Sequence, residues 1–451
     1  MKRPVALAVA LAAFAVRASW LLAVGPDPSF AWTADSVNYV AGAGNLRNYQ
    51  VFSQSAREPL APDTVRTPGY PAFLVAFVGA PGPLDAMIRA RDVEWAQAAL
   101  GAATAGLIAA AALVLWESAA AAAAAGVLAA VDPMLLMHTP LLLTETLFLF
   151  LFSAGLLALA LGLKKDSPLE AALAGLLFGL AALTRPVGLY YFVPAALVAA
   201  WALRRKRSRA AWLAVFVAAS AALPLCWMAR NESACGVFTF SSIQGLNFNV
   251  RAASVDAEVK KISIGEATAD VEGMIKAEHP APFASVAEES QFEGRWSGRF
   301  IMRHPLGYAA VMAKDVVKIL GGHGMELFAW EILKDSRYDP LHTDAPSGRF
   351  AGTRALFERH RPLKVLIPVY WAWLVGVYSL AAFGFFSAWG KRETRWTALL
   401  CASVIVYFLG VTAGLGAYYR LRIPLLGAVY LLAGFGFAAI SGSGKHPKRN
   451  S

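Results

Sequence analysis

Charged side chains at the ends of apolar segments are of types that suit chemistry on a phosphate-bearing lipid. Asp35 lies in FAWTADSVNYV, directly after the first long apolar run, and Arg66 follows in RTPGYP. Arg185, Arg230 and Arg420 stand at the ends of later apolar runs. A carboxylate accepts the proton of an attacking hydroxyl, whereas arginine binds phosphate through two hydrogen bonds and stays charged near lipid. One acid and several arginines are therefore what a phosphate-linked lipid and a hydroxyl acceptor require.

Each of these groups also has a purely structural explanation. Asp35 suits the N-cap of a helix that begins at SVNYVAGAGNL, because aspartate is favoured at that position. A lone arginine at a helix end commonly anchors to lipid headgroups. Glu145, in LLLTETLFLF, is either a further polar group of the cluster or half of a buried pair with Arg17 or Arg185. The functional interpretation depends on the coincidence of these groups on one side of the membrane.

The rest of the chain has the composition of a polytopic membrane protein. Of its 451 residues, 57% are hydrophobic and 16% are charged, and the mean hydropathy is +0.50. The net charge is +11, but the basic residues form short clusters between apolar runs, where they orient the chain instead of binding nucleic acid. Cys226, Cys235 and Cys401 follow no metal-ligand or redox spacing.

The apolar runs predict an all-α fold with about ten membrane-spanning helices. The first has a basic start and no cleavage site, so residues 1–24 are expected to form an uncleaved anchor helix. Six spans are expected within 94–229 and three within 363–441, and 442–451 is a short cytoplasmic tail. The runs beyond the first are 94–116, 119–138, 141–163, 168–186, 188–203, 210–229, 364–389, 396–415 and 423–440.

Basic clusters indicate which face is cytoplasmic. Lys2 and Arg3, KK at 164, RRKRSR at 204, KRETR at 391 and KHPKR at 445 all fall on one side of the ten spans. The connections 25–93 and 230–362 are then extracytoplasmic loops, and the first carries Asp35. RTPGYPAFLVAF predicts a turn leading into an interfacial helix, while FASVAEESQFEGRWSGRFIMRHP and GYAAVMAKDVVKIL predict short surface helices by their spacing.

The order of several motifs resembles a known group of enzymes. ADSVNYVAGAGNL, RTPGYPAFLVAF, LLLTETLF, LTRPVGLYY, MARNESACGVFTFSSIQGLNF and YYRLRIPLL follow one another as in the polytopic GT-C glycosyltransferases. More narrowly, they resemble the bacterial members related to protein mannosyltransferases and to the lipid A aminoarabinose transferase, the dolichyl-phosphate-mannose mannosyltransferase family. The resemblance covers about residues 4 to 440.

The resemblance implies a membrane glycosyltransferase of the bacterial inner membrane with its active site on the extracytoplasmic face. Its donor would be a sugar on a polyprenyl phosphate and its acceptor an extracytoplasmic lipid, glycan or protein. We expect the transfer to be inverting. Asp35 matches the catalytic base of the first loop. The other expected site residues are Arg66, Arg185, Arg230 and Arg420 for the donor and its phosphate, and Asn38, Tyr39, Tyr70, Glu145 and Tyr419 as cleft-lining groups.

One departure from the family concerns metal dependence. Many relatives have two adjacent acidic residues in the first loop, whereas Ser36 follows Asp35 here, so no motif supports a required divalent metal.

A transporter or flippase of a lipid-linked sugar is the competing class of function. It would use the same arginines without a base, but such proteins usually have pseudo-symmetric halves. A non-enzymatic envelope scaffold would leave the charged cluster unexplained. The second-loop histidines His279, His304, His323, His342 and His360 show no metal-ligand spacing.

Overall fold

The computed structural model describes residues 4–55, 60–283, 285–338, 357–415 and 419–442. Over these ranges the chain is helical, without strands, and has one isolated bridge between Val78 and Ile88. The predicted all-α class is therefore confirmed.

Seven helices are long and apolar enough to cross a membrane, in the part of the chain that the structure describes. Three shorter apolar helices occupy the remaining predicted runs, so every predicted run is helical and the chain is an integral membrane protein. The seven are α1 (Pro4–Val24), α5 (Ala90–Trp116), α8 (Glu145–Lys165), α11 (Arg209–Cys235), α18 (Leu363–Trp389), α19 (Arg395–Thr412) and α20 (Ile423–Ile440) with its preceding turn η5 (Tyr419–Arg422). The shorter three are α6 (Ala119–Val131), α9 (Pro168–Thr184) and α10 (Phe192–Ala202), the last preceded by η3 (Pro186–Gly188).

The most buried helix of the bundle is α20, which packs against α6 and α18. Its glycines allow this approach, because a Cβ at Gly434 would clash with the carbonyl oxygen of Ala121 on α6. Likewise, a Cβ at Gly384 on α18 would clash with the carbonyl oxygen of Leu432. Lipid supplies no hydrophobic drive for helix association, so close backbone packing at small residues holds such helices together.

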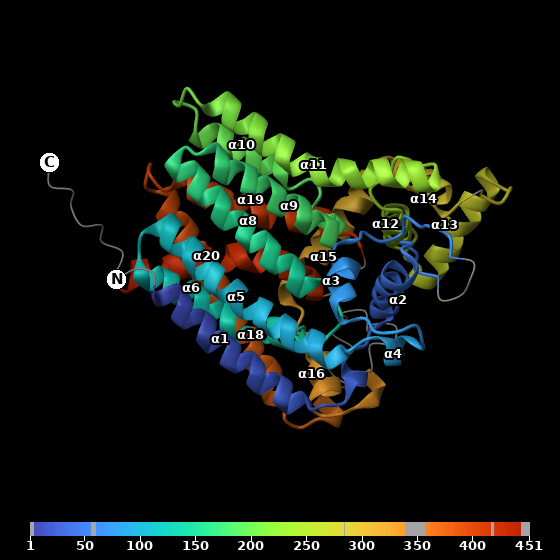
Figure 1. The fold of residues 1–451 in the computed structure, drawn as a ribbon, viewed down its shortest axis with the longest axis horizontal. Coiled ribbons are helices and arrows are strands. Elements are labelled where there is room, and N and C mark those ends of the chain that lie inside the picture. The colour runs from blue at the N-terminus through green and yellow to red at the C-terminus, as the bar shows by residue number, and fades with distance from the viewer. Residues whose placement is uncertain (1–3, 56–59, 284, 339–356, 416–418, 443–451) are drawn as a thin grey trace.

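The remaining helices gather at one end of the long ones, as Figure 1 shows for α2, α12, α13 and α14. The two helices predicted for the second loop are confirmed as α14 and α15, and RTPGYPAFLVAF forms the short helix α3 and the turn η2. The first-loop elements are η1 (Pro28–Ala31), α2 (Ala34–Tyr49), α3 (Gly69–Leu74), η2 (Val75–Phe77) and α4 (Leu84–Met87), and α7 (Pro133–Met137) precedes α8. The second-loop elements are α12 (Ile243–Lys260), α13 (Ile264–Glu278), α14 (Val286–Arg303), α15 (Pro305–Gly321), α16 (Met325–Glu331) and η4 (Ser336–Tyr338).

Basic clusters lie at the opposite end of the bundle from Asp35. Lys164 pairs with Glu117 at 2.7 Å, where α8 and α5 end, and Lys206 lies 3.8 Å from Asp166. Lys391 lies over the ring of Phe435, near the end of α20, whereas Arg420 of η5, directly before α20, pairs with Asp35. This arrangement agrees with the predicted sidedness for these three clusters; the clusters at residues 2–3 and 445–449 lie outside the described residues.

Candidate active site

Asp35 stands in the first turn of α2 without capping it. The N-cap is Thr33, whose Oγ1 accepts a hydrogen bond from the backbone N–H of Ser36 at 3.3 Å. In return, the Ser36 Oγ accepts from the backbone N–H of Thr33 at 3.0 Å, and it donates to the carbonyl oxygen of Leu142 at 3.0 Å. The interpretation of Asp35 as the cap is therefore wrong, because a capping box already satisfies this helix end. The carboxylate is left to make contacts outside its own helix.

Two arginines from distant parts of the chain hold the Asp35 carboxylate, and we call this arrangement the clamp. The Nη2 of Arg66 lies 2.7 Å from Oδ1, and the Nη2 of Arg420 lies 2.8 Å from Oδ2. Burial by itself raises the pKa of Asp35, but the charges and hydrogen bonds of Arg420 and Arg66 outweigh it and hold the pKa at about 2. The clamped carboxylate is therefore ionised at neutral pH and is only a weak base.

Tyrosines form the wall beside the clamp. The Arg66 guanidinium lies 5.3 Å from the ring centre of Tyr39, whose ring meets that of Tyr70 edge to face at 5.3 Å. The hydroxyl of Tyr70 donates to Oε1 of Gln97 at 2.9 Å, and Gln97 donates to the carbonyl oxygen of Leu141 at 2.8 Å. Burial raises the pKa of Tyr39 and raises that of Tyr70 well above its ordinary value, so both phenols are neutral.

Gln97 is a site-supporting residue that the sequence reasoning missed. It is fully buried on α5, and its Nε2 also donates to the carbonyl oxygen of Thr139 at 3.0 Å. It thereby ties Tyr70 to the segment that leads into α8. The sequence signal that could have identified Gln97 is a polar amide inside an apolar run, since such residues in membrane helices usually find a hydrogen-bond partner.

A second ion pair lies next to the clamp. Arg185, at the end of α9, pairs with Glu145 at the start of α8, and its Nη1 also contacts Oγ1 of Thr144 at 3.2 Å. Arg420 interacts electrostatically with both Asp35 and Glu145, which joins the two pairs into one cluster. Three arginines against two carboxylates leave one excess positive charge in this cluster, an environment that attracts an anion.

The structure also decides which arginine pairs with Glu145. Of the two partners considered, Arg185 is confirmed. Arg17 instead donates to the carbonyl oxygens of Ala129 and Ala130, each at 3.3 Å, and so fastens α1 to α6.

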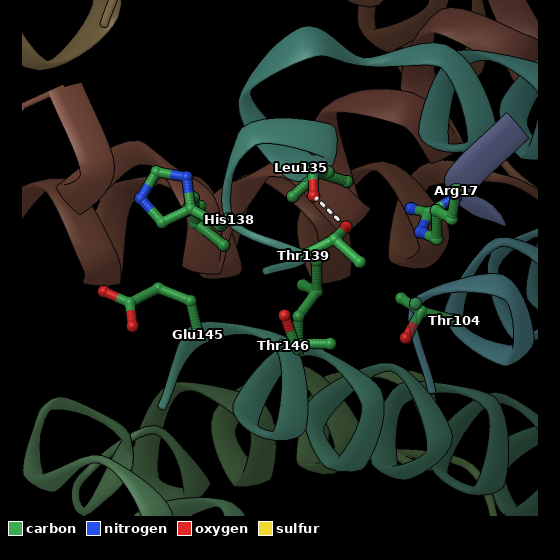
Figure 2. Close-up of a pocket in the computed structure, with 10 residues that line it drawn as sticks. Arg17, Thr104, Leu135, His138, Thr139, Glu145 and Thr146 are labelled. Atoms are coloured by element: carbon green, nitrogen blue, oxygen red, sulfur yellow. Dashed lines mark hydrogen bonds between the residues drawn. The ribbon is translucent and has the colours of Figure 1, made fainter. Parts of the chain in front are cut away.

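A small internal pocket lies behind Glu145. Figure 2 shows Arg17, Thr104, Thr139 and His138 arranged around it with Glu145, and Thr139 donating to the Leu135 carbonyl oxygen. Its volume is about 20 Å³. A cavity of this size has room for about one water molecule, so a sugar does not fit there. The clamp, which is partly open to solvent, is the better candidate for the reacting centre.

Three other predicted site residues, Arg230, Asn38 and Tyr419, are not members of the clamp. Arg230 donates to the carbonyl oxygen of Asp63 at 3.0 Å and lies 4.9 Å from the Trp227 ring centre, so its contacts fasten the first loop to α11. Asn38 is half-buried on α2, one turn after Asp35. Tyr419 is half-buried beside Arg420 and packs against the backbone at Gly322 and Gly324, which links the second loop to the clamp. Their predicted roles in binding stay predictions.

In the described part of the chain, no group of three His, Cys, Asp or Glu side chains is arranged to hold a metal ion. The second-loop histidines contact other partners. His279 and His304 reach the backbone carbonyl oxygens of Ala281 and Phe300, and His360 lies 2.8 Å from the Asp335 carboxylate. His323 accepts from the backbone N–H of Met325, and His342 lies outside the described residues.

Comparison with known proteins supports the resemblance seen in the sequence. Residues 87–227 match the family described as dolichyl-phosphate-mannose-protein mannosyltransferase, which confirms the resemblance for that part of the chain. No curated protein sequence matches significantly.

Among solved structures, the chain is similar to the archaeal oligosaccharyltransferase AglB from Archaeoglobus fulgidus in complex with an inhibitory peptide and a dolichol-phosphate. The TM-score is 0.56 at 12% identity, over 97% of this chain and 50% of that one. The crystal structure of the Archaeoglobus fulgidus oligosaccharyltransferase tethered with an acceptor peptide gives a TM-score of 0.51 at 11% identity, with the same coverage. The chain thus spans half the length of these structures, and the likeness shows a GT-C fold.

Proposed function

We propose that this membrane protein is a GT-C glycosyltransferase that moves a sugar from a polyprenyl-phosphate donor to a hydroxyl of an extracytoplasmic acceptor. The observation that carries the proposal is the clamp, in which Asp35 lies between Arg66 and Arg420 at 2.7 and 2.8 Å. The fold and the family match of residues 87–227 support the same class of activity. The acceptor, whether lipid, glycan or protein, is left open by these observations.

The donor phosphate also controls how basic Asp35 is. Without donor, the arginines hold the pKa of Asp35 at about 2. A phosphate that enters the cluster competes for the same guanidinium groups, because charge-assisted hydrogen bonds to phosphate and carboxylate have the same geometry. Once Arg66 and Arg420 turn toward the phosphate, burial still acts on Asp35 and raises its pKa. The carboxylate then becomes a stronger base only when the donor is in place.

The transfer step follows from this arrangement. The acceptor oxygen forms a bond to the anomeric carbon, and its proton passes to Asp35. The bond between the anomeric carbon and the phosphate oxygen breaks, and the electron pair leaves with the polyprenyl phosphate, so configuration is inverted. The two arginines stabilise the charge that develops on this leaving group. Arg185 and Glu145 keep Arg420 oriented, and Tyr39 and Tyr70 supply a neutral wall.

The proposed orientation of the chain in the membrane follows from where its basic clusters lie. We place residues 25–93 and 230–362 on the extracytoplasmic side of a bacterial inner membrane, with the clamp at that face. The basic clusters at 164, 204 and 391 support this orientation, because they lie at the opposite end of the bundle and positive residues favour the cytoplasm.

The test uses the purified full chain in lipid vesicles with radiolabelled polyprenyl-phosphate sugars and added acceptors that bear hydroxyls, namely lipids, glycans and peptides. We expect wild type to release polyprenyl phosphate, and Asp35→Asn to lose at least about 100-fold in rate, the scale of general-base catalysis. Asp27→Asn is the matched control, since Asp27 is an exposed aspartate of the same loop that caps η1. Size-exclusion chromatography checks folding. Equal release by Asp35→Asn and wild type would contradict the base, and movement of intact labelled lipid across the bilayer by both would indicate a flippase.

A further inference from the structure

A second cavity lies on the same end of the molecule as the clamp. It has a volume of about 350 Å³ and lies between the start of α12 and the middle of α14. Small-molecule sites have volumes of about 300–1,000 Å³, so this cavity is large enough for one or two sugar rings. Its lining residues are Thr239, Ser241, Gln244, Gly245, Phe248, Ser290, Gln291, Gly294 and Arg295, and we call it the groove.

The groove is built from two helix faces. Gln244 and Phe248 are four residues apart on α12, and Gln291 and Arg295 are four apart on α14, so each pair projects from one side of its helix. The helices touch at Gly245, whose backbone N–H donates to Oγ of Ser290 at 3.1 Å. A Cβ at Gly245 would clash with the carbonyl oxygen of Ser290, so glycine is required for this contact.

The lining chemistry suits a carbohydrate. Gln244 and Gln291 each present a donor and an acceptor, as a polyol requires, and the Ser290 hydroxyl, which accepts from the Gly245 N–H, keeps its own proton to donate. Phe248 adds a partly exposed aromatic ring against which the C–H face of a pyranose can pack. No carboxylate lines the groove in the described residues, and Arg295 is its only charged lining group there.

Hydrogen bonds connect the groove to the segment that directly precedes Arg66. Ser241, in the groove wall, donates from its Oγ to the carbonyl oxygen of Val65 at 2.6 Å. The next residue, Ser242, donates from its backbone N–H to the carbonyl oxygen of Thr64 at 2.8 Å. Val65 directly precedes Arg66, which holds Asp35. The groove wall is therefore hydrogen-bonded to the backbone that positions Arg66.

We propose that the groove binds the acceptor and that the group it recognises is a sugar residue of that acceptor. The inference rests on the proposed function, since it names the acceptor class for the transfer at Asp35. Gln244, Gln291 and Phe248 select the sugar, and Ser241 fixes the position of the groove relative to Asp35 through Val65 and Arg66.

The test measures sugar binding without turnover. The purified full chain in lipid nanodiscs is irradiated with a methyl mannoside bearing a benzophenone, and labelled peptides are mapped by mass spectrometry. We expect label in residues 239–248 and 290–295, displaced by unlabelled methyl mannoside. Gln244→Ala and Phe248→Ala should each reduce it about tenfold, the loss expected for one or two hydrogen bonds or an equivalent contact. Leu246→Ala is the matched control, because Leu246 is exposed on the same helix outside the groove lining.

The outcomes separate the groove from the proposed function. Label that is unchanged in Gln244→Ala and Phe248→Ala, or that lies outside the groove, would overturn the sugar site. Displacement by a short acceptor peptide but not by methyl mannoside would overturn the sugar class in favour of a protein acceptor. Failure of wild type to release polyprenyl phosphate from any donor would contradict the glycosyltransferase itself, even where groove labelling is as expected.

Discussion

Replacing Arg66 with glutamine tests the clamp most directly. The Arg66 Nη2 lies 2.7 Å from Oδ1 of Asp35, and the Asp35 side chain is 24% exposed. Two unit charges about 4 Å apart interact by about 4 kcal/mol at an effective dielectric constant of about 20, enough to change a pKa by about three. With Arg420 still in place, we expect Arg66→Gln to raise the pKa of Asp35 from about 2 to about 4 or 5.

Two assays measure the effect of Arg66→Gln. The infrared band of a protonated carboxyl, isolated by difference against the same variant carrying Asp35→Asn, reports the pKa directly. In wild type we expect Asp35 to stay ionised down to about pH 3, whereas in Arg66→Gln it should take up its proton near pH 4 or 5. The kcat/KM for donor should fall about 10- to 100-fold, because a charge-assisted hydrogen bond to phosphate is lost.

Arg47→Gln is the control for this experiment. Arg47 is exposed in the last turn of α2, the helix that carries Asp35, so its removal changes the net charge equally. An Asp35 pKa that is the same in Arg66→Gln and in wild type would refute the clamp. A lowered kcat/KM with an unchanged pKa would mean that Arg66 binds donor without restraining the carboxylate.

Three further predictions concern stability. Because the pKa of Asp35 is lowered from 3.8 to about 2, its ionised form stabilises the fold by about 2 kcal/mol above pH 4. We expect this contribution to disappear as pH falls from 4 to 2. The melting-temperature difference between wild type and Asp35→Asn should therefore become smaller at acid pH. Glu145→Gln should cost about 3 kcal/mol in thermal unfolding, because Arg185, whose side chain is only 12% exposed, is left without its charged partner, and adding Arg185→Met should recover part of that loss. Ser36→Ala should cost about 1 kcal/mol, because it removes half of a capping box and the bond to Leu142, and an unchanged melting temperature would contradict that role.

Much of the fold could be predicted because it depends on local properties of the chain. Hydrophobic length fixes where a helix crosses lipid, and each predicted run is helical in the structure. Apolar spacing near 3.6 residues likewise predicted α14 and α15. Lysine and arginine clusters indicated one face, and the three described clusters lie together at one end of the bundle.

Partners within the site were harder to predict, because they depend on helix packing. Asp35 and Arg420 are separated by 385 positions, and nothing in either segment specifies their contact. The choice between Arg17 and Arg185 as partner of Glu145 likewise depends on which helix lies beside α8. Arg230 has the same local setting as the other arginines, yet it donates to the backbone of the first loop and lies against the Trp227 ring.

The sequence by itself determined the membrane class, the helix positions and the residue types able to do the chemistry, because hydropathy and charge act locally. Only the tertiary structure decided which of those residues meet. It assigned the helix cap to Thr33 and left Asp35 between Arg66 and Arg420. It also formed the groove from two helices of the second loop, because a cavity between separate helices exists only once they pack.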